Sequence, residues 1–237
     1  MITEAMIIAG GFGTRLRGAV PDLPKCMAPI LAKPFIGYLM DYLQRQGIRR
    51  FILCLGYKAD VVQQYLNTQY GHLTLVYQIE HEPLGTGGAI RAACSLATEK
   101  TVLVLNGDTF FKIDVPELDI FHQQYQGDCT ICLKPMKQFE RYGVVELNEN
   151  NSVQSFREKQ FYESGLINGG TYALNVPAFL AAALPEKLSF EKDYLETHAQ
   201  SGKLIGHIQD VYFIDIGVPE DFERAQTELL LNTENYD

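Results

Sequence analysis

A glycine-rich turn near the N-terminus holds the first residues of this 237-residue chain that could do chemistry. An apolar run over residues 6–9 leads into Gly10-Gly11-Phe12-Gly13, which Thr14-Arg15 follows. Glycines let backbone N–H groups come close to phosphate oxygens, and Arg15 and Lys25 would add positive charge beside them. The pattern predicts a nucleoside triphosphate site, and a tight strand-to-helix turn without a ligand is the plainer alternative.

Two common phosphate-binding fingerprints are absent from the sequence. A P-loop needs Gly-Lys followed by Ser or Thr, and the chain contains no such triplet. A dinucleotide-binding loop needs a third glycine at the position where Leu16 stands. The chain is therefore expected to be neither a P-loop kinase nor a dehydrogenase.

Two aspartates, Asp108 and Asp215, each follow a strongly apolar stretch that predicts a strand. Ligands of open α/β sheets bind beyond the carboxyl ends of the strands, so both carboxylates could face one crevice beside the triphosphate. Mg²⁺ takes a few carboxylates, keeps waters and bridges phosphate oxygens. The pair predicts a Mg²⁺ site, although either aspartate alone could be a turn residue or a helix cap.

Three further polar stretches are candidates for ligand contacts. Gly85-Thr86-Gly87-Gly88 opens a helix, so its amides could approach a base, ribose or phosphate, or could serve loop geometry alone. Lys159 could hold a second anion or be a solvated charge at a strand end. Asn168-Gly169-Gly170 could contact hydroxyls closely, or could form a hairpin turn.

The hydrophobic pattern predicts the elements that must position these residues. Strands are expected over residues 6–9, 51–55, 73–79, 101–105, 128–134, 143–147, 153–157, 170–174 and 205–214. Helices are expected over 34–47, 60–67, 89–97, 116–126, 177–184, 190–200 (with Ser189 as its N-cap) and 219–231. Strict alternation up to about residue 110 implies βαβ units. The pattern predicts one Rossmann-like, three-layer α/β domain with a mixed, mostly parallel sheet.

Composition narrows the class of protein. The net charge of −9 argues against a nucleic-acid partner, and no apolar run approaches the 18 residues of a membrane span. A cytoplasmic protein is expected, because a strand pattern starts at once where a signal peptide would stand. The five cysteines are expected to be reduced, and strand periodicity places Cys129 and Cys132 on opposite faces of one strand.

Six motifs in order resemble those of the sugar-1-phosphate nucleotidyltransferases. They are residues 9–16 with Pro24-Lys25 and Pro29, then 85–88, 106–108, 158–159, 168–171 and 215–217. The resemblance spans nearly the whole chain and implies a GT-A-like fold. Within the family, PLGTGGAI, VLNGDTFF, LINGG and YFIDIGVPED are most similar to heptose 1-phosphate guanylyltransferases, which make GDP-heptose for bacterial surface polysaccharides.

The resemblance also implies roles for individual residues. Catalysis would fall to Arg15, Lys25 and Asp108, and Mg²⁺ would be bound by Asp108 and Asp215. The nucleotide would be held by Gly10, Gly11, Gly13, Thr14, Glu80, Gly85, Thr86 and Gly88. The sugar phosphate would be held by Asn106, Gly143, Glu158, Lys159, Asn168 and Gly169. Two departures from the family pattern, Arg17-Gly-Ala-Val20 and Cys26, concern the shape of the first loop.

The resemblance implies transfer of GMP from GTP to a heptose 1-phosphate. The first half of the chain, to about residue 110, would bind the nucleotide and the remainder the sugar phosphate. Mannose 1-phosphate guanylyl transfer, or uridylyl or thymidylyl transfer to another sugar 1-phosphate, remains an alternative. A catalytically inactive nucleotide-sugar sensor is a second alternative, against which the intact Arg15, Lys25, Asp108 and Asp215 argue.

Overall fold

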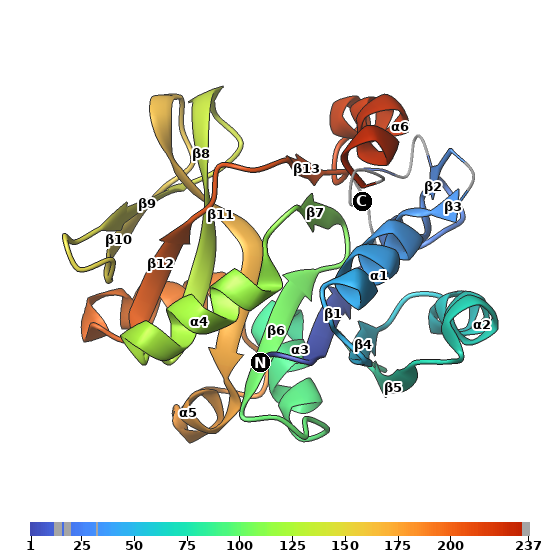
Figure 1. The fold of residues 1–237 in the computed structure, drawn as a ribbon, viewed down its shortest axis with the longest axis horizontal. Helices are drawn as coiled ribbons and strands as arrows, with labels where there is room; N and C mark the ends of the chain where they lie inside the picture. The colour runs from blue at the N-terminus through green and yellow to red at the C-terminus, as the bar shows by residue number, and fades with distance from the viewer. Residues whose placement is uncertain (12–15, 17–19, 32, 234–237) are drawn as a thin grey trace.

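Four parallel strands form one side of the central sheet of the computed structural model, which describes residues 1–11, 16, 20–31 and 33–233 (Figure 1). They are β1 (Glu4–Ala9), β4 (Arg50–Leu55), β5 (Thr74–Ile79) and β6 (Thr101–Asn106). Their order is β6-β1-β4-β5, and every neighbouring pair is parallel. The predicted parallel half of the sheet is therefore present, and all four carboxyl ends meet at one edge.

The second half of the chain extends the sheet with mixed pairings. The added strands are β8 (Cys129–Phe139), β9 (Val144–Leu147), β10 (Val153–Arg157), β11 (Tyr162–Asn175) and β12 (Leu204–Ile208). β11 is antiparallel to both β6 and β8, and β12 runs parallel to β8. In the described part of the chain the sheet has nine strands. The predicted mixed α/β sheet is confirmed.

Helices cover both faces of the sheet and bury a separate apolar core on each. One core involves α1 (Phe35–Arg45), α2 (Ala59–Tyr70), α4 (Val115–Tyr125) and α6 (Pro219–Thr233). The other involves α3 (Gly85–Cys94), α5 (Val176–Ala181) and the π-helical segment η3 (Phe190–Glu196). Along β4, Phe51 and Leu53 enter the first core and Ile52 and Cys54 the second, because successive side chains of a strand point to opposite faces. The three-layer prediction is confirmed.

The cysteines follow the same rule. Cys129 lies in one core and Cys132 in the other, so the prediction of opposite faces is confirmed. All five cysteines are buried free thiols, and burial raises the pKa of Cys26 and Cys94 to about 12. These thiols are packing residues of the cores.

Several predicted elements differ from the structure. The strand expected over 205–214 is wrong: β12 ends at Ile208, and β13 (Phe213–Asp215) pairs instead with the short strand β7 (Thr109–Phe111). The hairpin turn considered for 168–170 lies inside β11, where the register with β8 shifts between Asn168 and Tyr172. The helix expected over 89–97 begins four residues earlier and ends at Cys94.

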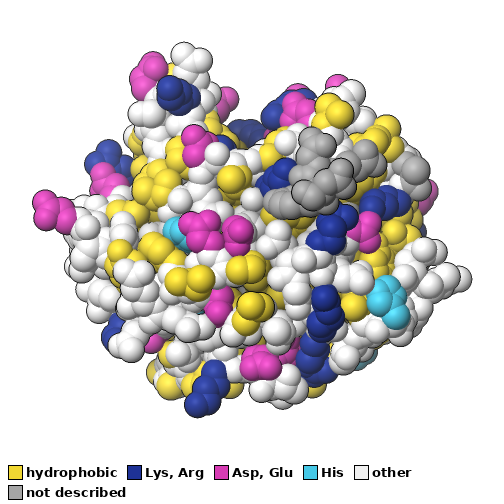
Figure 2. All heavy atoms as spheres, viewed as in Figure 1, with side chains coloured by type: hydrophobic (Ala, Val, Ile, Leu, Met, Phe, Trp, Pro, Cys, Tyr) yellow, Lys and Arg dark blue, Asp and Glu magenta, His cyan; other side chains and the backbone are white. Residues whose placement is uncertain are grey.

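Smaller elements complete the chain. They are the 3-10 turns η2 (Lys25–Met27) and η4 (Ala199–Ser201) and the paired strands β2 (Pro29–Ile30) and β3 (Lys33–Pro34). Ser189 caps η3, as predicted, by accepting a hydrogen bond from the Lys192 amide at 3.2 Å. Among the described residues, the helices are all too short or too polar to cross a bilayer. On the face drawn in Figure 2, acidic and basic side chains are interspersed.

Candidate active site

The candidate site lies where the four parallel strands end. Gly10 follows β1, Gly56 follows β4, Glu80 follows β5, and Asn106 is the last residue of β6. Each of these residues lines one of two cavities. The carboxyl edge of a parallel sheet is where α/β proteins bind ligands, so the predicted location of the site agrees with the observed cavities.

The first cavity, here the N-terminal cavity, has a volume of about 360 Å³. Its lining residues include Gly10, Gly11, Glu80, Gly85 and Thr86, all predicted to contact the nucleotide. A Cβ at Gly10 would lie 3.1 Å from Glu80 Oε1, and the Leu84 amide donates to Glu80 Oε2 at 3.3 Å. Burial raises the pKa of the Glu80 carboxyl. Glycine at position 10 thus leaves room for a half-buried acceptor that could bind a donor on a base or a ribose.

The glycine-rich start of α3 packs against the segment that precedes η3. The amides of Gly87 and Gly88 both donate to the Leu188 carbonyl, at 3.0 and 3.3 Å. A Cβ at Gly88 would lie 2.6 Å from the Glu186 carbonyl oxygen. These two amides dock the segment before η3 onto α3, and Gly88 permits the close approach of the two backbones. The predicted role of Gly88 in nucleotide binding stays a prediction.

A cluster of charges follows β6 and β13. Lys25 Nζ lies 3.1 Å from Asp108 Oδ2, and both side chains are about a quarter exposed (24% and 27%). The Ile216 amide donates to the Asp108 carbonyl at 3.0 Å, which fixes β13 beside the end of β6. Asp215 Oδ1 accepts a hydrogen bond from the Gly217 amide at 2.8 Å. The structure thus brings together three residues that are far apart in the sequence.

The electrostatics of Asp215 fit a cation site. Burial raises the pKa of its carboxyl, and the negative charge of Asp108 raises it further. The Gly217 amide, Lys25 and Arg141 lower the pKa, but by less, so the net shift is upward. Two neighbouring carboxylates in a partly buried place repel each other and are costly to ionise together. A divalent cation would relieve that repulsion, and carboxylate oxygens are the ligands that Mg²⁺ prefers. Asp108 and Asp215 therefore fit a Mg²⁺ ion.

The second cavity, here the C-terminal cavity, has a volume of about 410 Å³. The residues predicted to hold the sugar phosphate all line it: Asn106, Gly143, Glu158, Lys159, Asn168 and Gly169. Asp215 lines it as well. Six residues predicted from separate motifs thus meet at one cavity, next to the charge cluster.

Two glycines shape this cavity. Gly170 has φ +67°, and a Cβ there would lie 2.6 Å from Asn106 Nδ2. A Cβ at Gly143 would collide with the Arg157 carbonyl oxygen. In the irregular part of β11, Asn168 accepts from the Gly170 amide at 3.0 Å and donates to the Tyr172 hydroxyl at 2.9 Å. The Asn-Gly-Gly sequence therefore forms a bulge in a strand that lines the cavity.

Several residues of the site were not predicted. The C-terminal cavity is also lined by Tyr142, Arg157, Tyr172, Ser189, Glu191 and Lys192. Glu191 Oε2 accepts a hydrogen bond from Thr86 Oγ1 at 2.9 Å, and Thr86 Oγ1 accepts one from the Phe190 amide at 2.9 Å. Thr86 lines the N-terminal cavity and Glu191 the C-terminal cavity, so the two side chains form part of a wall between the cavities. The residues that were not predicted are single residues of β10, β11, η3 and the loops between elements, and no spacing pattern in the sequence would have identified them.

Three predicted residues cannot be placed. Gly13, Thr14 and Arg15 lie outside the described residues, as do residues 17–19 of the loop in which the sequence departs from the family pattern. The first-loop residues that the structure does place on a cavity are Gly10 and Gly11. The phosphate-binding role of the turn therefore stays a prediction.

Comparison with known families identifies the class of protein to which this fold and these two cavities belong. The family model described as nucleotidyl transferase matches residues 4–232, and the chain belongs to this family. The match includes both cavities and the charge cluster.

Two relatives of known name and one solved structure match the chain over more than nine-tenths of its length. The chain is 47% identical over 226 residues to D-glycero-alpha-D-manno-heptose 1-phosphate guanylyltransferase of Aneurinibacillus thermoaerophilus, covering 95% of this chain and 98% of the relative. It is 44% identical to the enzyme of the same name from Campylobacter jejuni, covering 92% and 96%. The crystal structure of HddC from Yersinia pseudotuberculosis superposes with a TM-score of 0.85 at 36% identity, covering 96% of this chain and 99% of HddC. HddC has also been crystallised in complex with GMP-PN.

Proposed function

We propose that this chain transfers GMP from GTP to D-glycero-α-D-manno-heptose 1-phosphate, with release of pyrophosphate. The observation that carries the proposal is the cluster of Lys25, Asp108 and Asp215 beside two cavities of different lining. The family supports nucleotidyl transfer, and the names of two relatives that match almost end to end support the heptose and the guanine nucleotide.

Each cavity is proposed to hold one substrate. The residues that line the N-terminal cavity all lie between Ile8 and Ala89, and those of the C-terminal cavity lie between Asn106 and Asp215. This division supports a nucleotide-binding first half and a sugar-phosphate-binding remainder. Glu80 would accept a hydrogen bond from the nucleotide, and Lys159 would pair with the phosphate of the sugar.

The reaction needs positioning and charge more than acid–base groups. An oxygen of the sugar 1-phosphate attacks the α-phosphorus of GTP in line, forming a P–O bond while the bond to pyrophosphate breaks. The attacking oxygen is already an anion, so no side chain has to remove a proton. The work of the chain is to hold two anions in line and to neutralise the negative charge on the phosphates.

Lys25 is proposed to supply the larger part of that neutralisation among the described residues. Its ammonium lies 3.1 Å from Asp108 and beside Gly217, where a Cβ would come within 3.5 Å of Nζ. Because Gly217 has no side chain, that side of the ammonium would be open to a phosphate. Arg15 would add a second positive charge if it acts as the family resemblance implies.

Mg²⁺ is the proposed metal, with Asp108 and Asp215 as its protein ligands. When bound, it would neutralise phosphate charge and polarise the phosphoryl oxygens. The enzyme is further proposed to act in the cytoplasm, and its product to serve lipopolysaccharide, capsule or S-layer glycan synthesis.

A pyrophosphate-release assay tests the function. GTP, UTP and dTTP are each combined with heptose, mannose and glucose 1-phosphates in the presence of Mg²⁺. We expect GTP with the heptose 1-phosphate to give the highest kcat/KM. Faster release with mannose 1-phosphate or with another nucleotide would assign a different transferase. Release with none of the pairs would contradict the enzyme and favour a sensor.

A further inference from the structure

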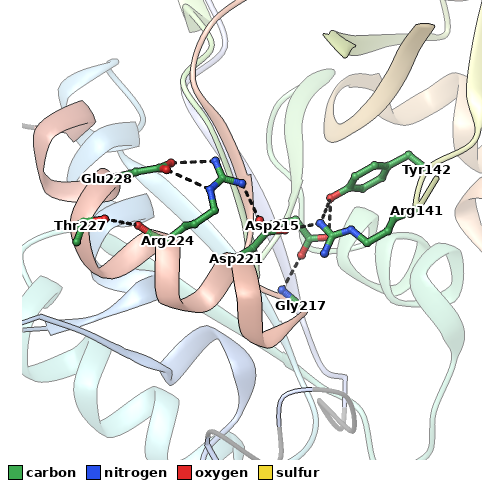
Figure 3. A network of polar contacts seen from close by, with 8 residues as sticks. All are labelled: Arg141, Tyr142, Asp215, Gly217, Asp221, Arg224, Thr227 and Glu228. Atoms are coloured by element: carbon green, nitrogen blue, oxygen red, sulfur yellow. Dashed lines mark hydrogen bonds and ion pairs between the residues drawn. The ribbon is translucent and has the colours of Figure 1, made fainter. Parts of the chain in front are cut away.

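Arg141 and Tyr142 lie in the short loop between β8 and β9, and they contact residues more than seventy positions away. Arg141 donates to the Tyr142 hydroxyl oxygen at 3.0 Å and forms an ion pair with Asp221 in the first turn of α6. The Tyr142 hydroxyl lies 3.4 Å from Asp215 Oδ2. Figure 3 shows the loop, β13 and α6 meeting through these side chains.

The direction of the hydrogen bonds in this group follows from the chemistry of its members. A guanidinium can only donate, so Arg141 must bind the oxygen lone pair of Tyr142. The single proton of the Tyr142 hydroxyl is then free to point at the ionised carboxylate of Asp215, which can only accept. Asp215 Oδ1 is already bound by the Gly217 amide at 2.8 Å. Both carboxylate oxygens are thus held, one from each side.

Asp221 fixes the position of Arg141. Its side chain is 11% exposed and binds two arginines. Oδ2 pairs with Arg141, which faces the site, and Oδ1 accepts from Arg224 at 2.7 Å. Arg224 faces away from the site and also binds Glu228 through two hydrogen bonds of 3.1 and 3.0 Å. One carboxylate therefore holds two arginines of the same chemistry, and only one of them reaches the Asp215 side.

We propose that Arg141 is a positioning residue that acts through Tyr142 on the carboxylate of Asp215, and that Asp221 holds it in place. The proposal rests on the proposed function in taking Asp215 as a ligand of Mg²⁺. Second-layer partners of metal ligands set the orientation of those ligands. The ion pair between the loop and α6 thus sets how well the metal binds when the nucleotide is present.

Calorimetry with a non-hydrolysable GTP analogue tests this proposal. Its Kd is measured with Mn²⁺ and again with EDTA, and the ratio gives the gain in affinity that the metal supplies. We expect Arg141→Gln and Tyr142→Phe each to lower that gain by about tenfold. Because Arg141 acts through Tyr142, the double variant should lose no more than Tyr142→Phe alone. Asp221→Asn should reproduce the loss of Arg141→Gln.

Arg224→Gln is the matched control. It removes the other arginine bound to the same carboxylate, and it should leave the metal-dependent gain at the wild-type value. Melting temperatures show whether every variant is folded. An unchanged gain in a folded Arg141→Gln protein, or losses that multiply in the double variant, would overturn the proposal. Failure of the proposed function would look different: the wild type would release no pyrophosphate from GTP, whatever Arg141→Gln does to metal-dependent binding.

Discussion

Replacing Lys25 by methionine removes one positive charge from the site and keeps most of the side-chain volume. In the wild type the ammonium lies 3.1 Å from Asp108 Oδ2, at the end of a lysine side chain that is 24% exposed. Methionine cannot pair with a carboxylate or a phosphate. The substitution therefore separates two contributions of Lys25, one to the stability of the fold and one to the charge balance of the reaction.

The two contributions have different expected sizes. At an effective dielectric constant of about 20, charges at the separation of Lys25 and Asp108 attract by about 5 kcal/mol. Desolvation, side-chain entropy and solvent screening offset most of this in a partly exposed pair, so the free energy of unfolding should fall by only about 1 kcal/mol. A preorganised charge that faces the reacting phosphates is worth more, because losing such a group lowers kcat by about 10² to 10³-fold.

Steady-state pyrophosphate release and thermal unfolding measure both quantities on the same samples. Lys33→Met is a suitable control, since Lys33 also pairs with an aspartate, Asp41, at similar exposure but away from both cavities. We expect the control to lose stability and keep its kcat. A folded Lys25→Met protein whose kcat falls by less than about tenfold would refute the assigned role of the lysine.

Two further predictions follow from Asp215 and Gly85. Burial and Asp108 raise the pKa of Asp215 in the folded protein. Without metal, this carboxyl therefore stabilises the fold at pH values below its pKa in the unfolded chain, and that stability is lost as the pH rises through its higher pKa in the folded protein. Asp215→Asn should therefore raise the melting temperature at neutral pH in EDTA while it abolishes turnover; an unchanged or lower melting temperature would contradict this. Gly85 has φ +77°, and a Cβ there would lie 2.5 Å from the Leu188 carbonyl oxygen. Gly85→Ala should cost about 2 kcal/mol or more in chemical denaturation. Gly11→Ala, whose Cβ would have no atom of the described residues within 4 Å, should cost little. Equal losses would contradict the packing argument.

The location of the site could be predicted because it depends on strand order and on little else. Apolar runs identify the parallel strands, and the polar residues after each run must meet at one edge of the sheet. Gly10, Glu80 and Asn106 meet there for this reason. Cys129 and Cys132 were placed correctly by the same kind of rule, the alternation of side chains along a strand.

The predictions that failed concern features that depend on tertiary contacts. The stretch 205–214 has apolar residues on both sides of Gln209-Asp210, and its pattern alone does not show whether that polar pair ends the strand or lies within it. After Ile208 the Gln209 amide still donates to the Leu133 carbonyl of β8 at 2.9 Å, and Phe213 then pairs with Phe111 of β7. The Arg141–Asp221 pair joins residues 80 positions apart, and a lone arginine in a polar loop carries no periodic signal. Such contacts become visible only when the chain is folded.

The charge cluster gives a reason why the proposed reaction would need a cation in addition to Lys25. Lys25 opposes two carboxylates, Asp108 and Asp215, so these three residues together carry one net negative charge, within a chain of net charge −9. That arrangement by itself repels a triphosphate and a sugar phosphate. A divalent ion on the two carboxylates changes the sign of the cluster to one net positive charge, which attracts both anions. Burial and, after it, the negative charge of Asp108 raise the pKa of Asp215, so the two carboxylates are costly to ionise together without metal. The same closeness of two carboxylates would make the cluster suited to polyphosphate chemistry once a divalent ion is bound.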